Sequence, residues 1–375
     1  VIRDAPNLWP ALFDWANGTG MDTSDFGITV GPSDLAPGEL GVFAKHKLEP
    51  GDILVWAPTS LLLTKDKAVS LWGDVVSGMT EHVCIMLLLI HERCVRGEDS
   101  QWSTYWGSLP NFRRDVAGPS FLWEEDEWEW LEGSDGYGAS IQMHNNIVDL
   151  VETVETLVKE RPQEFPAEAF TTENVFWAAG VVTSRAYGDD EAGSHLAIAP
   201  LVDFLNHRAG ALQLTRFGNG IVAYAHKHFD KGDEVWVSYG GKNNAQLLSQ
   251  YGFVDDGNQE EAVFLRVDDH LPLAEPHLEA KRRLLTELLD DDRDPATAIF
   301  RLARRPRDWQ ARLIPAIRVL ALGEEDTPPE SVQDLVPTQA AALEAAAWRL
   351  LADAIVRRDA EYPGTLEENK AQQVG

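Results

Sequence analysis

Cysteine is scarce in this chain of 375 residues, since only Cys84 and Cys94 are present. Two cysteines at this separation are too few for a disulfide framework or a cysteine-rich zinc cluster, and they fit no Cys-x-x-Cys motif. The longest uninterrupted apolar run, Val83 to Ile90, is far shorter than the roughly 20 residues that a membrane helix needs. The start VIRDAPNLWP holds no apolar signal core. We therefore expect a reducing compartment, cytoplasmic or nuclear, or an organelle if a transit peptide preceded Val1, and no membrane partner.

Basic residues are also few, because 32 Lys and Arg stand against 61 Asp and Glu and leave a net charge of −29. Such a surface repels phosphate backbones, so we expect no nucleic-acid partner. It would attract a basic protein or peptide, although the same charge also occurs in proteins that are merely soluble. Apolar residues make up 44% of the chain, which is enough for a folded core.

Several common catalytic motifs are missing. The sequence has no G-x-x-x-x-G-K-[ST] phosphate loop, no G-x-S-x-G nucleophile motif and no H-E-x-x-H zinc motif. Gly136-Tyr137-Gly138 begins like a dinucleotide-binding turn, but no strand precedes it, and we expect an ordinary loop. His226 and His228 share one face of a strand end, yet no third ligand stands at suitable spacing. We therefore expect exposed strand-end histidines and no metal.

The apolar pattern predicts two blocks of short strands, separated by helices and followed by a helical tail. Runs broken by Gly and Pro predict strands at residues 28–30, 40–47, 52–57, 196–204, 211–217, 221–225 and 234–239, with turns at Pro37-Gly38 and Gly218-Asn219-Gly220. Helical spacing predicts helices at residues 7–17, 80–97, 147–160 and 171–187, and from about 272 onward. This order is typical of an α+β fold and not of an alternating parallel sheet.

Two segments near the end of the second strand block stand out. The first is IAPLVDFLNH at residues 198–207, which is predicted as an apolar strand that ends in Asn-His. The second is GDEVWVSYGGKNNAQLLSQYGF at residues 232–253, predicted as a strand that ends in Tyr239-Gly240, then a helix from about Asn244, then Tyr-Gly-Phe. Taken alone, Asn-His at a strand end is usually a turn, and Tyr239 would be a core aromatic.

These segments resemble the SET-domain protein methyltransferases, particularly the branch of the Rubisco large-subunit lysine methyltransferase and the actin-histidine methyltransferase. In that branch an Asn-His motif precedes a Tyr-Gly…Asn-Ala…Gly-Phe motif. GELGVFAKHKLEPGDILVWAP at residues 38–58 and WSTYWGSLP at 102–110 also resemble the family, so nearly the whole chain is covered. The resemblance implies an N-terminal helix and first SET strands (1–75), a helical insertion (76–195), C-terminal SET motifs (196–258) and a helical domain that resembles a substrate-binding domain (259–375).

The resemblance also implies methyl transfer from S-adenosyl-L-methionine to a protein substrate, with S-adenosyl-L-homocysteine as the product. We expect the chain to be a monomer. This transfer is an in-line displacement, so the enzyme must align donor and acceptor and exclude water. A lysine must arrive neutral, and desolvation and the sulfonium charge both lower its pKa from about 10.4. Tyr239 is expected to be the catalytic residue, whose hydroxyl orients the attacking nitrogen.

The remaining site residues are likewise implied by the resemblance. Arg185 is expected near the cofactor carboxylate, where a planar guanidinium fits, and Gly41 lets the backbone approach the cofactor closely. Aromatic walls for the substrate side chain are expected from Tyr187, Tyr239 and Tyr251. The full set of expected cofactor contacts is Leu40, Gly41, Val42, Arg185, Asp203, Phe204, Leu205, Asn206, His207, Tyr251, Gly252 and Phe253.

Two positions bear on whether lysine or histidine is the nucleophile. Tyr187, two residues after Arg185, resembles the aromatic residue of the lysine-methylating relatives, whereas the histidine-methylating relative has an asparagine there. Val202 stands where the histidine enzyme has a tryptophan. We therefore expect methylation of lysine, with a protein-histidine methyltransferase and a catalytically silent SET domain that binds a protein segment as the alternatives.

Overall fold

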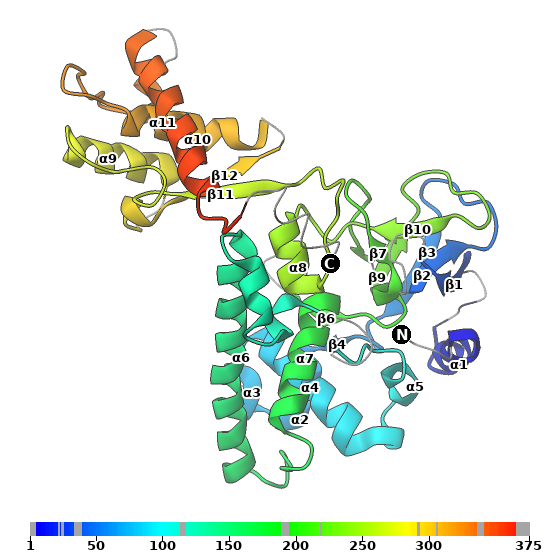
Figure 1. Ribbon diagram of the computed structural model, residues 1–375. Helices are drawn as coiled ribbons and strands as arrows, with labels where there is room; N and C mark the ends of the chain where they lie inside the picture. Colours follow the sequence, from blue (N-terminus) through cyan, green and yellow to red (C-terminus); the bar gives the residue numbers. More distant parts are fainter. Residues whose placement is uncertain are drawn as a thin grey trace. The chain divides into compact units, whose positions relative to one another are not determined.

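The computed structural model describes residues 5–21, 23, 26–33, 40–112, 118–188, 195–217, 220–290, 293–304, 307–335 and 341–364. Two units make up the chain (Figure 1). Unit 1 comprises residues 1–124, 139–241 and 246–254, and unit 2 comprises residues 125–138, 242–245 and 255–375. Pro37-Gly38 and Gly218-Asn219, which were predicted to form turns, lie outside the described residues.

Three sheets of short strands form the β part of unit 1. The first has the order β1-β2-β10-β7, in which β7 runs parallel to β10 and the other pairs are antiparallel. The orders of the other two are β3-β9-β8 and β4-β6-β5, with antiparallel pairs throughout. Their bounds are β1 Ile28–Pro32, β2 Leu40–Ala44, β3 Ile53–Pro58, β4 Leu63–Thr64, β5 Ala186–Tyr187, β6 Ala197–Ile198, β7 Asn206–His207, β8 Thr215–Phe217, β9 Gly220–Tyr224 and β10 Glu234–Val237.

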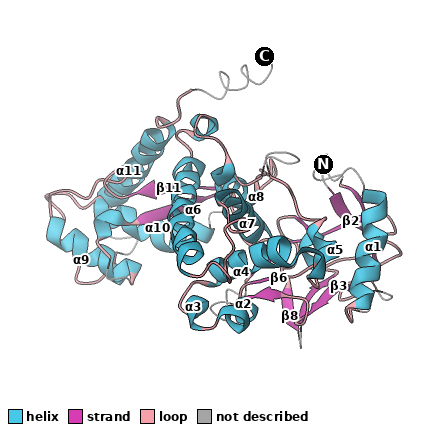
Figure 2. Ribbon diagram, turned by 90° about the horizontal axis from the view of Figure 1, so that it is seen from below, coloured by secondary structure: helices cyan, strands magenta, loops and turns pink. Residues whose placement is uncertain are grey.

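Helices pack against one another beside these sheets, as Figure 2 shows for α2, α4 and α7. Every residue of α4 from Cys84 to Ile90 is buried, so the longest apolar run of the sequence forms a core helix. Among the described helices, none is long and apolar enough to cross a membrane. The helices up to residue 251 are α1 Ala5–Gly18, α2 Lys65–Trp72, α3 Asp74–Ser77, α4 Glu81–Ile90, α5 Ser103–Trp106, α6 Asp135–Glu160, α7 Thr172–Arg185 and α8 Asn244–Tyr251.

Threonine caps explain where α4 and α7 begin. The hydroxyl of Thr80 accepts a hydrogen bond from Val83 N (3.4 Å), and that of Thr171 accepts one from Asn174 N (3.2 Å). Each threonine thereby satisfies a backbone donor that the first helical turn leaves unpaired. The predicted helix at 80–97 is α4 followed by a π-helical segment, His91–Arg96.

Unit 2 has its own apolar core, which includes Leu265, Leu284, Ile317 and Leu351. Two antiparallel strands, β11 and β12, and three helices supply it. Their bounds are β11 Ala262–Arg266, β12 Ile299–Ala303, α9 Leu278–Leu289, α10 Arg307–Leu320 and α11 Ala341–Asp359.

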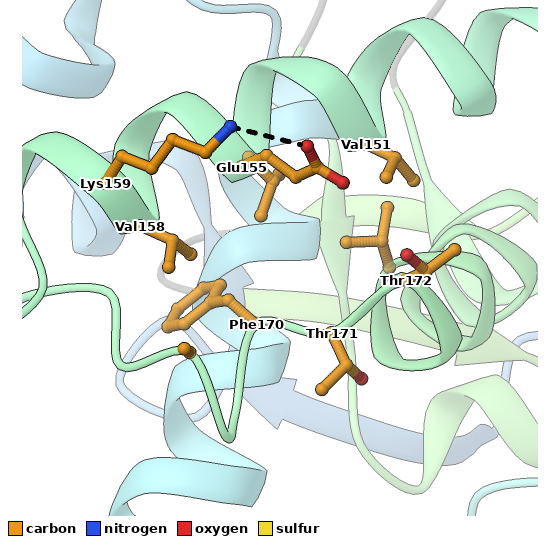
Figure 3. Close-up of a pocket in the computed structure, with 10 residues that line it drawn as sticks. Val151, Glu155, Val158, Lys159, Phe170, Thr171 and Thr172 are labelled. Carbon is orange, nitrogen blue, oxygen red and sulfur yellow. Dashed lines mark ion pairs between the residues drawn. The ribbon is translucent and has the colours of Figure 1, made fainter.

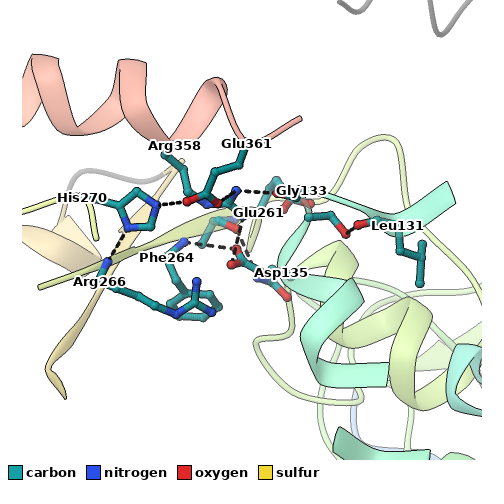
Figure 4. Close-up of polar contacts among 12 residues, drawn as sticks. Leu131, Gly133, Asp135, Glu261, Phe264, Arg266, His270, Arg358 and Glu361 are labelled. Carbon is teal, nitrogen blue, oxygen red and sulfur yellow. Dashed lines mark hydrogen bonds and ion pairs between the residues drawn. The ribbon is translucent and has the colours of Figure 1, made fainter. Parts of the chain in front are cut away.

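A buried arginine links α11 to the start of α6 within unit 2 (Figure 4). Arg358, whose side chain is 4% exposed, forms ion pairs with Asp135 (3.1 Å) and Glu361 (2.8 Å) and donates to the Gly133 carbonyl. Glu361 also lies 2.7 Å from His270 Nε2, and His270 Nδ1 accepts from the Arg266 N–H at 2.9 Å. Because Nδ1 is an acceptor, the ring proton of neutral His270 lies on Nε2 and points to Glu361.

The predicted strands at residues 196–204 and 198–207 are wrong. Only β6 and β7 are extended there, and Val202–Phe204 form a 3-10 turn between them. Leu201 has a φ of 71°, which breaks an extended strand, and the Asp203 side chain turns inward to Arg185. The apolar run is therefore buried as a turn.

Two further predictions are corrected by the structure. Gly136-Tyr137-Gly138 is not a loop but lies in the first turn of α6, where Asp135 suits the helix N-terminus. The chain from residue 272 is not helical throughout, because β12 pairs with β11 in register from Ile299 to Ala303. The helices predicted at 7–17 and from Asn244 are confirmed.

Candidate active site

The sheet β1-β2-β10-β7 brings together the two segments that the sequence singled out. Asn206 and His207 pair in parallel with Trp236 and Val237, so the Asn-His segment lies beside the strand that leads to Tyr239. On the other side of β10, Glu234 and Val235 pair with Phe43 and Val42 of β2. β10 is therefore the central strand to which both predicted cofactor segments attach.

The side chain of Asn206 is held by groups from three segments. Its Nδ2 donates to the Leu40 carbonyl (2.9 Å) and to Glu234 Oε1 (3.1 Å). Ser33 Oγ also donates to Glu234 Oε1 at 2.8 Å, and both Ser33 and Glu234 are buried. A Cβ on Gly41 would lie 2.3 Å from Glu234 Oε1, so a larger residue there would displace the Glu234 side chain that holds Asn206. Leu40, Gly41 and Asn206, which were predicted for one site, lie together in the structure.

Tyr239 is fixed at both ends by the Asn-His segment. Its hydroxyl donates to the Leu205 carbonyl (2.9 Å), and its backbone N–H donates to His207 Nδ1 (2.9 Å). The neutral His207 ring therefore carries its proton on Nε2. Burial raises the pKa of Tyr239, although the positive charge of Arg185 acts against this. The hydroxyl consequently stays protonated near neutral pH.

An aromatic cluster surrounds Tyr239. Its ring stacks on Tyr251 with centroids 4.8 Å apart, and His207 lies 5.1 Å from Tyr239 and 6.1 Å from Phe253. Gly252, with a φ of 85°, lets this turn approach the Gly118 carbonyl, which a Cβ would reach at 2.3 Å. The structure thus gathers the predicted Tyr239, Tyr251 and Phe253 around His207.

Arg185 lies beside Asp203. Its Nη1 donates to the Asp203 carbonyl and to Asp203 Oδ2, both at 3.1 Å, and the fully buried Tyr105 donates its hydroxyl to Oδ2 at 2.6 Å. Burial raises the pKa of Asp203, while Arg185 and Tyr105 counteract the rise. Arg185 Nε and Asp203 Oδ1 are buried without a hydrogen-bond partner among the described residues. The site therefore keeps one unused donor and one unused acceptor.

The side chains of several other predicted residues lie in the core or on another sheet. The side chains of Val42, Phe204 and Leu205 are buried in the core, and Phe204 packs edge-on against Trp9 at 4.6 Å. Tyr187 lies on β5, and its hydroxyl donates to the Leu214 carbonyl at 2.5 Å. The sequence reasoning missed Tyr105, Ser33 and Glu234. Only Glu234 carried a local signal, as a charged residue that the predicted strand pattern leaves facing inward.

A cavity of about 330 Å³ lies elsewhere in unit 1 (Figure 3). It is lined mainly by Val151, Val154, Val158 and Phe170, and Lys159 and Glu155 form an ion pair of 3.7 Å at it. None of the predicted site residues lines it. Across the described residues, no group of three or more His, Cys, Asp or Glu side chains could hold a metal ion.

Solved structures share this architecture. The SET domain of LSMT bound to lysine and AdoHcy superposes with a TM-score of 0.76 at 21% identity, covering 99% of this chain and 85% of that one. The chain has the LSMT SET-domain fold. Rubisco LSMT bound to AdoMet matches with a TM-score of 0.73, covering 98% of this chain and 85% of the other. The predicted α+β SET-domain fold is confirmed.

Sequence comparisons point the same way. A family model described as Rubisco LSMT substrate-binding matches residues 272–373. The chloroplastic Rubisco large subunit N-methyltransferase of Pisum sativum is 24% identical over 87% of this chain and 66% of its own length. The actin-histidine N-methyltransferase of Gallus gallus is 24% identical over 85% of this chain and 54% of its own length. The chain with the LSMT SET-domain fold thus spans between half and two thirds of these curated relatives.

Proposed function

We propose that this chain is a protein-lysine N-methyltransferase that uses S-adenosyl-L-methionine as its methyl donor. The proposal rests on the parallel pairing of β7 with β10, which holds Asn206 and His207 beside the strand that leads to Tyr239. The shared fold supports it, because the LSMT SET domain is described as bound to lysine and AdoHcy. The match of residues 272–373 to a substrate-binding model supports a protein as the substrate.

The unused polar atoms of the site fit the amino-acid end of S-adenosyl-L-methionine. That end carries a carboxylate and an ammonium group, and a buried polar atom without a partner costs about 1–3 kcal/mol. Arg185 Nε, a donor, would bind the carboxylate, and Asp203 Oδ1, an acceptor, would bind the ammonium. The other proposed cofactor contacts are Leu40, Gly41, Val42, Phe204, Leu205, Asn206, His207, Tyr251, Gly252 and Phe253.

Tyr239 orients the attacking nitrogen and does not act as a base. Burial raises its pKa, so the hydroxyl keeps its proton near neutral pH. That proton is donated to the Leu205 carbonyl, and the oxygen retains lone pairs that accept an N–H from the incoming amine. A lysine ammonium therefore loses its proton to water before methyl transfer.

The rest of the catalytic contribution is alignment. S-adenosyl-L-methionine, when bound, supplies a methyl group on a positively charged sulfur that needs no covalent help from the protein. The stacked rings of Tyr239 and Tyr251 and the fixed Asn206 side chain hold the site rigid and limit access of water.

Lysine is proposed as the acceptor over histidine. The rings of Tyr239 and Tyr251 suit an alkyl chain that ends in a cationic amine. Tyr187 resembles the aromatic residue of the lysine-methylating relatives, and Val202 differs from the tryptophan of the histidine-methylating one. Histidine methylation is the second candidate, because an actin-histidine relative matches at the same 24% identity as the Rubisco relative.

Labelling tests the proposal. The protein is incubated with methyl-labelled S-adenosyl-L-methionine and an extract of the organism that encodes it, and the labelled amino acid is identified after hydrolysis. We expect label on lysine, lost with Tyr239→Phe while the affinity for S-adenosyl-L-methionine changes less than about twofold. Tyr137→Phe, at a tyrosine that is 38% exposed, is the matched control.

Each other outcome selects an alternative. Label on histidine would replace lysine by histidine as the acceptor. Cofactor binding in a calorimeter without any transfer would support the silent SET domain, and unchanged turnover of Tyr239→Phe would remove Tyr239 from the catalytic role.

A further inference from the structure

A basic cluster lies around Trp236, directly beside the candidate site, and consists of the cations Arg208 and Lys227 and the imidazole of His226. Arg208 follows His207, and its backbone N–H donates to the Val237 carbonyl (2.9 Å), which continues the pairing of β7 with β10. Trp236 is the ladder partner of Asn206. The cluster therefore begins one residue beyond the proposed cofactor contacts.

Two cations share the same indole ring. Arg208 Cζ lies 4.4 Å from the centroid of Trp236, and Lys227 Nζ lies 4.7 Å from it and 5.0 Å from the ring of Phe229. The His226 ring is 6.1 Å from Trp236. Burial lowers the pKa of His226, and the charges of Lys227 and Arg208 lower it further. The three basic groups are therefore close enough to interact electrostatically.

Across the described residues, no carboxylate forms an ion pair with this cluster. In the part of the chain that the structure describes, no salt bridge or side-chain hydrogen bond is made by Arg208 or Lys227, and His226 Nδ1 is buried without a partner. Acidic residues outnumber basic ones by 61 to 32. Arg208 and Lys227 are therefore unpaired in a chain where carboxylates are abundant. Unpaired like charges repel one another, and an incoming anion would relieve that repulsion.

We propose that Arg208, Lys227 and Trp236 bind an acidic side chain of the protein substrate, next to the residue that is methylated. This inference rests on the proposed function. The guanidinium of Arg208 matches a carboxylate in a two-pronged contact, and the Trp236 face packs on the methylenes of Asp or Glu. The local charge is thus opposite to that of the whole chain, which by itself suggested a basic partner.

Other anions fit less well. A nucleic acid presents a row of phosphates that a net charge of −29 repels. The carboxylate of S-adenosyl-L-methionine is assigned to Arg185 Nε, which is buried beside Asp203, whereas Arg208 and Lys227 are exposed. One carboxylate at a time suits a cluster with two unpaired cations.

A binding assay without methyl transfer tests the proposal. The fluorescence anisotropy of a short dye-labelled peptide with a single glutamate among glycine and serine residues is titrated with protein at about 0.15 M ionic strength, where long-range repulsion by the acidic chain is screened. We expect the double variant Arg208→Ala/Lys227→Ala to weaken binding about tenfold, and Trp236→Ala to weaken it as well. The control Lys159→Ala/Arg161→Ala removes the same charge from exposed positions near the end of α6 and should change binding less than about twofold.

Two results would overturn the proposal. The first is a peptide that fails to bind the wild-type protein, or that binds both double variants alike. The second is an affinity for S-adenosyl-L-methionine that falls about tenfold in Arg208→Ala/Lys227→Ala, because the cluster would then hold the cofactor. Cofactor binding by the wild-type protein is measured alongside, so that a failure of the proposed function is seen separately. Thermal unfolding of each variant verifies that it is folded.

Discussion

The Tyr105 hydroxyl lies 2.6 Å from the Asp203 carboxylate, across 98 positions of sequence. Arg185 binds the same carboxylate and the Asp203 carbonyl. Together they fix the 3-10 turn Val202–Phe204, and the next carbonyl, that of Leu205, accepts the hydroxyl of Tyr239. We therefore propose that Tyr105 positions Tyr239 through Asp203.

Tyr105→Phe should lower kcat on the order of tenfold, because small displacements in an aligned site are costly. The Tyr105 hydrogen bond lowers the pKa of Asp203. Its loss should raise that pKa further, so the acid limb of the rate profile should move to higher pH if ionised Asp203 is needed. The measurement is kcat against pH, with Tyr137→Phe as control. An unshifted limb would reduce Tyr105 to a packing role.

Gly41→Ala should impair cofactor binding and destabilise the protein by about 1–3 kcal/mol, the usual cost of overpacking. The added Cβ would lie 2.3 Å from Glu234 Oε1, which also holds Asn206. Gly31 is the ladder partner of Gly41, and there a Cβ would meet Phe43 at an ordinary 3.5 Å. Calorimetric titration with S-adenosyl-L-methionine should therefore show weaker binding for Gly41→Ala than for Gly31→Ala, and equal affinities would contradict the packing argument.

The sequence was sufficient to predict those parts of the site that local pattern encodes. The alternation of residues predicted β10, and the run that begins with an asparagine cap predicted α8. The resemblance to SET domains joined the Asn-His segment to Tyr239, as the pairing of β7 with β10 confirms. The inward orientation of the Asp203 side chain could not be predicted from the sequence, because its partners Tyr105 and Arg185 come from other elements.

Non-local contacts also explain the errors in secondary structure. Residues 196–204 are apolar enough for a strand, but their burial in a turn at Leu201 depends on the surrounding core. Ile299–Ala303 becomes a strand because it pairs with Ala262–Arg266, which the helical pattern around it concealed.

Lys67 should make stability depend on pH in the alkaline range. Its ammonium lies 4.7 Å from the Trp102 ring and donates to the Ser60 carbonyl, and burial lowers its pKa from 10.5 to about 8. Between these pH values the unfolded chain binds more protons than the folded one, so the contribution of Lys67 to stability rises with pH.

Urea unfolding across pH 8 to 10.5 checks this, with wild type compared against Lys67→Met. The wild type should gain about 1 kcal/mol on the variant over this range, a figure discounted for the partial exposure of Lys67. Lys159→Met, at a side chain that is 75% exposed, should show no such trend. A constant difference for Lys67→Met would contradict the depressed pKa.

Arg358→Met should destabilise unit 2 by about 3 kcal/mol, because removing one partner leaves a buried charge uncompensated. Asp135, 9% exposed, would lose its ion pair, and Glu361 would keep only His270 (Figure 4). Arg349→Met on the same helix is the control, since Arg349 is exposed and its side chain reaches only its own helix. In urea unfolding, Asp135→Asn/Arg358→Met should recover part of the loss by removing both charges. If Arg358→Met cost no more than Arg349→Met, the attachment of α11 to the start of α6 would owe its stability to apolar packing instead.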